Sequence, residues 1–229
     1  MAVSAEGDEL AGRLERVRGE IADAAAVAGR RPDEITTIVV TKFHPASLVE
    51  RLAALGVTDV GENRHQEAEA KAAALAGLHL NWHFIGQLQA NKAKAVVRYA
   101  CAIHSVDRDS LVDALAATQA TIDVFLQVNL TDDPGRGGVQ PALLEPLAER
   151  VLEHPQLRLR GLMAVATLGG DARVDFVRVR AASDRLGRLA PEATALSMGM
   201  SGDFRAAILE GATHLRIGTA ITGNRPTPG

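Results

Sequence analysis

The strongest constraint on the fold is an alternation, repeated about eight times, of short apolar stretches with amphipathic helical stretches. The predicted strands are ITTIVVTK, TDVGEN, NWHFIG, CAIHSVD, IDVFLQVN, LRLRGLMAV, TALSMGM and THLRIGTA. The helical patterns between them include PASLVERLAALG, RHQEAEAKAAALAG, DRDSLVDALAATQ, PALLEPLAERVLEHP and SGDFRAAILEGA. Continuous apolar strands are typical of a parallel sheet that is covered on both faces. The alternation therefore predicts an α/β protein with a closed (β/α)8 TIM barrel.

The two ends of the chain fit this barrel. Residues 8–28 predict an N-terminal helix that Gly29 and Pro32 stop, because apolar side chains recur at helical spacing. No helix is expected after the last strand, where NRPTPG is short and rich in proline, and the N-terminal helix is expected to cover that gap. We expect one domain over residues 1–229, with the barrel at 35–222. An open doubly wound sheet is the alternative, but no G-x-G-x-x-G opens its first helix.

Composition excludes several classes of partner. A net charge of −3 gives no overall basic field for nucleic acid or an anionic membrane. No stretch approaches the roughly 20 apolar residues of a membrane span, and the charged N-terminus does not resemble a signal peptide. The single cysteine, Cys101, permits no internal disulfide. We expect a cytoplasmic protein that is a monomer.

Active sites of such barrels lie at the carboxyl ends of the strands, which makes two cations of interest. Lys42 ends the first strand, and side-chain alternation would point it into the barrel mouth above Val40 and Ile38. Arg216 would point inward on the last strand, where its guanidinium needs an anionic or polar partner. A lysine that simply reaches solvent is the alternative for Lys42, and a structural ion pair is the alternative for Arg216.

The last two strand ends predict a phosphate site. Ser201 is expected at the N-cap of a helix, and Gly218 and Thr219 follow the last strand. Loops at these two places hold a phosphate in many such barrels, although Ser201 could also be a plain cap. A phosphate on one side and an amine on the other fit pyridoxal phosphate, whose aldehyde forms a Schiff base with lysine. Arg216 could face its pyridine nitrogen, where a fixed cation disfavours protonation and weakens the ring as an electron sink.

Three other features are given structural interpretations. His83 and His104 lie on successive predicted strands, but no H-E-x-x-H spacing or cysteine cluster accompanies them, so we expect histidines that fill the barrel or are hydrogen-bonded, and no metal. The segment TDDPGRGGV lacks the P-loop pattern and is interpreted as a loop. The stretch HQEAEAKAAALAG is interpreted as a solvated helix face.

The sequence resembles the pyridoxal-phosphate homeostasis proteins, small relatives of the barrel domain of bacterial alanine racemase. The resemblance covers nearly the whole chain after the first helix, through VVTKFHPASLV, VGENRHQEAEAK, WHFIGQLQANKAKAV, IHSVDR, LQVNL, LRGLMAVA, LSMGMSGDFRAAI and HLRIGTAITG. It implies a single-domain barrel that carries pyridoxal phosphate on Lys42. The site that it implies has phosphate contacts from Ser201, Gly218 and Thr219, Arg216 near the pyridine nitrogen, and Asn63 close to the cofactor. An ordinary polar residue at a strand end is the alternative for Asn63.

The resemblance also implies a role without turnover. Members of this family are taken to buffer pyridoxal phosphate and deliver it, so we expect exchange with free amino acids and transfer to apoenzymes that use this cofactor. The related racemase takes a second base, a tyrosine, from an additional domain, whereas the single tyrosine here, Tyr99, lies in the third helix region. Two positions depart from the family, with Arg64 where an aromatic residue is frequent and His44 where a lysine is common.

Two enzyme alternatives remain open. The first is an amino-acid racemase or related pyridoxal-phosphate enzyme that uses one base only. The second, more distant, is an aldolase that would form a Schiff base with a sugar phosphate in the same pocket without any cofactor.

Overall fold

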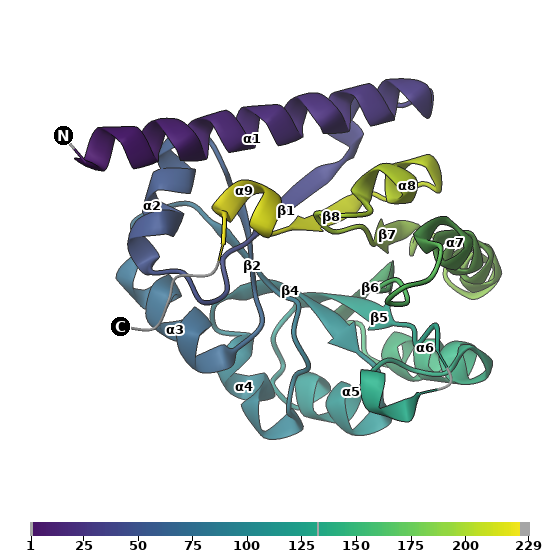
Figure 1. Ribbon diagram of the computed structural model, residues 1–229. Coiled ribbons are helices and arrows are strands. Elements are labelled where there is room, and N and C mark those ends of the chain that lie inside the picture. The colour runs from purple at the N-terminus through teal and green to yellow at the C-terminus, as the bar shows by residue number, and fades with distance from the viewer. Residues whose placement is uncertain (1, 132, 225–229) are drawn as a thin grey trace.

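A computed structural model describes residues 2–131 and 133–224 and shows a closed barrel of eight parallel strands in chain order (Figure 1). The strands are β1 (Thr36–Val40), β2 (Asp59–Glu62), β3 (Asn81–Phe84), β4 (Ala100–Val106), β5 (Ile122–Gln127), β6 (Leu157–Met163), β7 (Ala195–Ser197) and β8 (His214–Ile217). Strand β8 pairs with β1 and closes the barrel. The predicted (β/α)8 fold is confirmed, and each predicted strand contains an observed one, except that β4 begins one residue before its predicted start.

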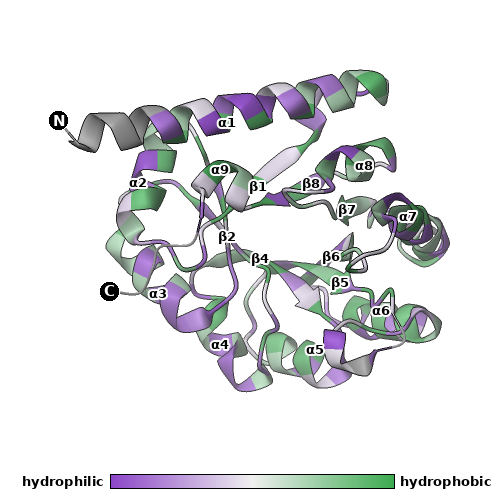
Figure 2. Cartoon of the chain, in the orientation of Figure 1, coloured by the Kyte–Doolittle hydropathy of each residue, from purple (hydrophilic) through white to green (hydrophobic). Residues whose placement is uncertain are grey.

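Helices surround the barrel in Figure 1. They are α1 (Ala2–Val27), α2 (Ala46–Ala54), α3 (His65–Ala74), α4 (Ala93–Val96), α5 (Asp109–Ala116), α6 (Leu144–Leu152), α7 (Ala172–Leu189), α8 (Phe204–Leu209) and α9 (Thr219–Thr222). Figure 2 shows hydrophobic and hydrophilic residues intermixed along α1, as expected of an amphipathic helix. In the part of the chain that the structure describes, no helix has the length and apolar character needed to span a bilayer.

The expectation that no helix follows the last strand is wrong. Strand β8 ends at Ile217, and the one-turn helix α9 follows it, because the amides of Ile221 and Thr222 donate to the carbonyl of Gly218 at 2.8 and 2.9 Å. The N-terminal helix lies across α8 and α9, as expected (Figure 1). Arg13 on α1 donates to the carbonyl of Ile221 at 2.8 Å. The assignment of residues 1–229 to one domain stays a prediction.

The strands place their side chains alternately inside the barrel and against the helices. A Cβ at Gly61 would lie 3.0 Å from Ile38 and 3.6 Å from Val40, so both side chains share the interior with Gly61. Val39 instead belongs to the apolar core between strands and helices, as do Leu215 and Ile217 on either side of Arg216. Lys42 and Arg216 are therefore both in phase with the residues that face inward.

Candidate functional site

Lys42 lies in a sharp turn directly beyond β1. The following residue, Phe43, has a φ of 68°, a left-handed conformation that is uncommon for a bulky side chain. Its amide donates to a carboxylate oxygen of Glu67 at 3.1 Å, which holds the turn against α3. The half-buried Lys42 places its Nζ 5.9 Å from the centroid of the Phe43 ring, and among the described residues it has no ion-pair partner. Its amine is therefore free for a ligand.

A second lysine beside this turn is held quite differently. The buried Nζ of Lys71 on α3 donates to Glu62 Oε1 at 2.6 Å and to the carbonyl of Thr41 at 2.8 Å. The hydroxyl of Thr41 donates to the same carboxylate oxygen at 2.7 Å. Burial raises the pKa of Glu62, although the hydrogen bond and charge of Lys71 oppose the shift. This cluster fixes the residue before Lys42, and it contradicts the prediction of a wholly solvated helix face, because the ammonium finds buried acceptors.

Asn63 follows β2 and lies against the end of β3. Its carboxamide oxygen is buried and has no hydrogen-bond partner among the residues described. A Cβ at Gly86 would come within 2.3 Å of the carbonyl oxygen of Asn63, so only glycine permits this approach. The neighbouring Arg64 places its guanidinium carbon 4.9 Å from the centroid of the Phe43 ring and thereby joins the ends of β1 and β2. Asn63 thus offers an unused polar group near the turn that carries Lys42.

The prediction that Ser201 is the N-cap of the helix after β7 is wrong. The N-cap is Asp203, whose carboxylate accepts from the amide of Met200 at 2.5 Å and closes a turn before the helix. Ser201 lies within that turn, and its Oγ accepts a hydrogen bond from the amide of Ala220 at 3.3 Å. Because a hydroxyl can accept and donate, its own proton remains available. The contact joins the loop after β7 to α9.

Gly218 and Thr219 complete this corner of the barrel. Gly218 is the N-cap of α9, and the exposed Thr219 is its first residue. A Cβ at Gly218 would lie 3.6 Å from the Cβ of Val40, so the end of β8 lies against the end of β1. The structure therefore brings Ser201, Gly218 and Thr219 into one cluster beside the strand that leads to Lys42.

Arg216 lies inside the barrel on β8, opposite Ile38 of β1. Its side chain is buried, Nη1 donates to Ser197 Oγ at 2.8 Å, and Nη2 donates to the carbonyl of Ala164 at 2.8 Å. Burial lowers its pKa to about 10, with the charge of Asp203 opposing, so the guanidinium remains a cation at neutral pH. The expected polar partner is confirmed as a hydroxyl and a carbonyl, and no carboxylate of the described residues pairs with it.

The two strand histidines are hydrogen-bonded, as interpreted from the sequence. His83 Nδ1 lies 3.0 Å from His104 Nε2, and His104 Nδ1 lies 2.8 Å from Ser197 Oγ. Among the residues that the structure describes, no group of three potential ligands is placed to hold a metal ion.

Sequence reasoning missed Ser197 and Lys71. The position of Ser197 at the end of a buried strand is a weak sequence signal for a functional role. The polar pattern of α3 contains no signal that Lys71 is buried.

Comparisons with known proteins identify the family to which the chain is similar. The profile of the alanine racemase N-terminal domain family matches residues 14–226. The pyridoxal phosphate homeostasis protein of Pseudomonas aeruginosa is 40% identical over 220 residues, which cover 94% of this chain and 96% of that protein. That of Escherichia coli K12 is 38% identical over 228 residues, which cover 95% and 97%.

A solved structure leads to the same group. PipY of Synechococcus elongatus, determined with pyridoxal phosphate bound, is 36% identical, superposes with a TM-score of 0.83, and matches over 93% of this chain and 100% of PipY. The chain therefore belongs to the alanine racemase N-terminal domain family and, within it, to the pyridoxal phosphate homeostasis proteins.

Proposed function

We propose that this protein binds pyridoxal 5′-phosphate as a Schiff base on Lys42 and serves intracellular homeostasis of this cofactor. The observation that carries the proposal is the amine of Lys42, which has no ion-pair partner among the described residues and follows β1, the strand that lies beside the cluster of Ser201, Gly218 and Thr219. Relatives named for pyridoxal phosphate homeostasis and the cofactor-bound PipY structure support it.

The residues present fit this cofactor. The hydroxyl of Ser201 has a proton to donate, and Gly218 and Thr219 present backbone and hydroxyl groups beside it, which suits an anionic phosphate. Asn63 contributes a buried carboxamide oxygen with no protein partner among the described residues. We assign the phosphate to the first three residues and a contact with the body of the cofactor to Asn63.

Arg216 is assigned to the pyridine nitrogen of the cofactor. Bound pyridoxal phosphate acts as an electron sink for carbanions, most strongly when its ring nitrogen is protonated. A guanidinium offers only donors and keeps its charge, so Arg216 would hold the nitrogen unprotonated. That choice suits storage of the cofactor better than carbanion chemistry.

We also propose a role without enzymatic turnover, which the position of the single tyrosine supports. The single tyrosine, Tyr99, lies just before β4, where its hydroxyl is 3.4 Å from His65 Nδ1 and burial raises its pKa. It is therefore not placed at a strand's carboxyl end as a second base for racemisation. We propose that the protein is a cytoplasmic monomer that exchanges its cofactor with free amino acids and passes it to apoenzymes.

Retention of the cofactor by variants tests the proposal. Lys42→Arg keeps the charge but cannot form a Schiff base, whereas Lys94→Arg changes an exposed lysine on α4 and is the matched control. We expect wild type and Lys94→Arg to retain pyridoxal phosphate on dialysis with a visible imine band, and Lys42→Arg to lose the band and bind at least about tenfold more weakly. Equal retention by Lys42→Arg would contradict the assignment.

Two further measurements separate the carrier from the enzyme alternatives. Incubation with alanine in heavy water should give little exchange at the α-carbon, and rapid, complete exchange would favour a racemase. Borohydride should trap cofactor-loaded protein. Trapping only in the presence of a sugar phosphate, with a colourless protein, would favour the aldolase.

A further inference from the structure

A continuous line of polar groups runs through the barrel interior from the buried Arg216 to the half-buried Asp59. It passes from the guanidinium to Ser197 Oγ at 2.8 Å, and from there to His104 Nδ1 at 2.8 Å. His104 Nε2 lies 3.0 Å from His83 Nδ1, and His83 Nε2 lies 3.0 Å from Asp59 Oδ1. The line links strands β8, β7, β4, β3 and β2. Apart from Arg216, it is composed of groups that the cofactor assignments leave unused.

The chemistry of its two ends fixes the direction of every hydrogen bond in the line. An ionised Asp59 only accepts, so His83 Nε2 carries a proton, and a neutral His83 then accepts at Nδ1 from His104 Nε2. A neutral His104 in turn accepts at Nδ1 from the hydroxyl of Ser197. Arg216 only donates, and it donates to that hydroxyl oxygen. All protons therefore point from the cation toward the carboxylate.

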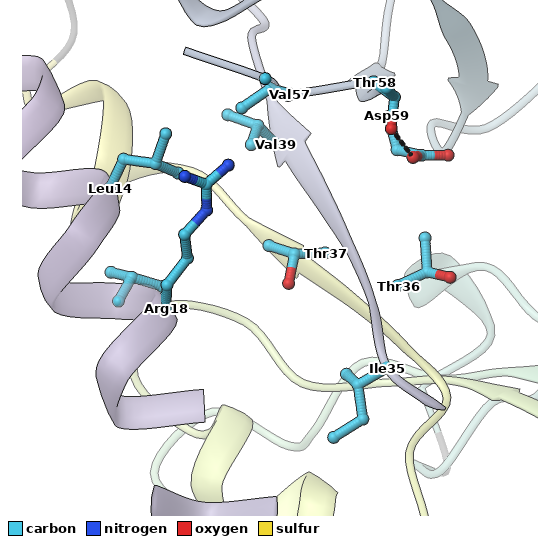
Figure 3. Close-up of a pocket in the computed structure, with 11 residues that line it drawn as sticks. Leu14, Arg18, Ile35, Thr36, Thr37, Val39, Val57, Thr58 and Asp59 are labelled. Atoms are coloured by element: carbon cyan, nitrogen blue, oxygen red, sulfur yellow. Dashed lines mark hydrogen bonds between the residues drawn. The ribbon is translucent and has the colours of Figure 1, made fainter. Parts of the chain in front are cut away.

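The surroundings of Asp59 favour its ionised form. Burial by itself would raise the pKa of Asp59. Hydrogen bonds from His83, Thr58 and Asn81 outweigh burial and lower the pKa of the carboxyl. Figure 3 shows Asp59 and Thr58 at the edge of a pocket of about 260 Å³ between α1 and the amino ends of the first strands. The acidic end of the line thus lies at the end of the barrel opposite the cofactor residues.

The surroundings of His104 favour its neutral form. Its side chain is fully buried, and this burial, reinforced by the positive charge of Arg216, lowers its pKa well below the usual value. The ring of Phe125 stacks on it at 4.3 Å between centroids and fixes its plane. A neutral imidazole in a fixed position can hold one tautomer, and its two hydrogen bonds can polarise each other.

We propose that Ser197, His104, His83 and Asp59 are positioning residues that orient Arg216 and supply its counter-charge from the far end of the barrel. Arg216 has no carboxylate partner of its own among the described residues, and a buried guanidinium without one is costly. A carboxylate placed beside it would cancel the field that it exerts on a ligand. The line allows the charge to be balanced at a distance while other N–H groups of Arg216 stay available. The link to the pyridine ring rests on the proposed function, whereas the line itself does not.

Nitrogen-15 NMR of the protein labelled at histidine tests the line without any cofactor. We expect His83 and His104 both to carry their proton on Nε2 at neutral pH. A proton on Nδ1 of His104 would show that the direction is different and would overturn the proposal. Since this readout needs no pyridoxal phosphate, it stands even if the proposed function fails.

Asp59→Asn is the informative variant, because an amide can donate to His83 Nε2 and so reverse the direction of the hydrogen bonds along the line. The expected result is transfer of the His83 and His104 protons to Nδ1, and, with nitrogen-15-labelled pyridoxal phosphate bound, a displaced ring-nitrogen signal. Asp123→Asn is the matched control, since Asp123 also lies near the start of its strand but pairs with Arg158 at 2.6 Å outside the line. Unchanged tautomers in folded Asp59→Asn, or equal changes in both variants, would overturn the proposal.

Ser197→Ala separates positioning from folding. It removes the link between His104 and Arg216 but leaves the contacts of His83 with Asp59 and His104 in place. We expect the His83 tautomer to persist while the ring-nitrogen signal of the bound cofactor moves. An unmoved ring signal in this variant would show that the line does not act on Arg216. Failure of wild type to bind the cofactor would instead contradict the proposed function alone.

Discussion

At the scale of single residues, the four lysines of the chain are Lys42, Lys71, Lys92 and Lys94. Lys71 is held by a carboxylate and a carbonyl, whereas the amine of Lys42 has no ion-pair partner among the described residues. A nucleophilic amine must be able to reach an aldehyde, and an ammonium locked in a buried pair cannot do so without breaking that pair. The buried pair therefore fixes the local structure, and Lys42 is the lysine that we propose as the nucleophile.

Removal of Lys71 should destabilise the protein. Lys71→Ala would leave the carboxylate of Glu62 buried at 1% exposure without its cation, which costs roughly 3–5 kcal/mol in comparable cases. Denaturant unfolding measures the change, and Lys94→Ala at an exposed position should stay within about 0.5 kcal/mol of wild type. A Lys71→Ala protein as stable as Lys94→Ala would show that the cluster contributes nothing.

A methyl group at position 86 should disturb Asn63. Because a Cβ there would lie 2.3 Å from a backbone oxygen, Gly86→Ala is expected to cost about 1–3 kcal/mol of stability and to weaken cofactor binding. Gly77→Ala is the control, since a Cβ at that position would meet no atom within 4 Å. Thermal unfolding compares the stability of the two variants, and a binding titration compares their affinity for the cofactor. Equal behaviour of the two would contradict the close approach.

At the scale of elements, the end of β1 meets the loops that follow β7 and β8. The loop after β7 closes on itself through Asp203, and it contacts α9 through the hydroxyl of Ser201. Helix α1 lies over both α8 and α9 and so supports the loops from outside (Figure 1). The cluster of Ser201, Gly218 and Thr219 is therefore assembled by packing between elements that are far apart in the chain.

Loss of the Ser201 hydroxyl should affect binding more than folding. Ser201→Ala removes one donor to the phosphate, which is worth about 1 kcal/mol or roughly a fivefold weaker Kd for pyridoxal phosphate. Ser47→Ala, at an exposed position on α2, should bind as wild type does. Fluorescence titration of both variants provides the comparison. Unchanged affinity in Ser201→Ala would remove this residue from the phosphate site.

Sequence patterns predicted the strands better than the short helices and the contacts between them. The apolar rhythm located all eight strands, because burial on both faces dictates residue type at each position. It misplaced the start of α8, since Ser201 and Asp203 are both good caps and only the contact with Ala220 separates their roles. The sequence also indicated that His83 and His104 fill the barrel or are hydrogen-bonded, and the structure shows the hydrogen bond. The hydrogen bond between His104 and Ser197 could not be predicted, because it depends on the register of strands on different sides of the barrel.

At the scale of the whole molecule, the barrel holds several titratable groups in its interior. The described groups are Asp59, His83, His104, His214 and Arg216. Burial lowers the pKa of His214 to about 4, and it lowers that of His104 well below 6.5. Asp123 and Arg160 also act on His214, with opposite signs. Folding therefore keeps these two imidazoles neutral where an unfolded chain would protonate them.

Stability should consequently fall in acid. A histidine whose pKa is depressed on folding contributes stability that is fully present above its unfolded value of 6.5 and is lost as the pH falls toward the folded value, about 4 for His214. Each such group adds a slope of up to about 1.4 kcal/mol per pH unit in this window. Denaturant unfolding between these pH values should show the decline, and His214→Gln should flatten it. A profile that is flat in wild type would contradict the buried neutral state.

The most direct test of the central claim is mass spectrometry of cofactor-loaded protein after borohydride reduction, followed by peptide mapping. We predict one reduced pyridoxyl phosphate adduct, located on Lys42 and absent from Lys71, Lys92 and Lys94. An adduct on any of those three lysines in place of Lys42, or a protein that retains the cofactor without any reducible bond, would contradict the claim.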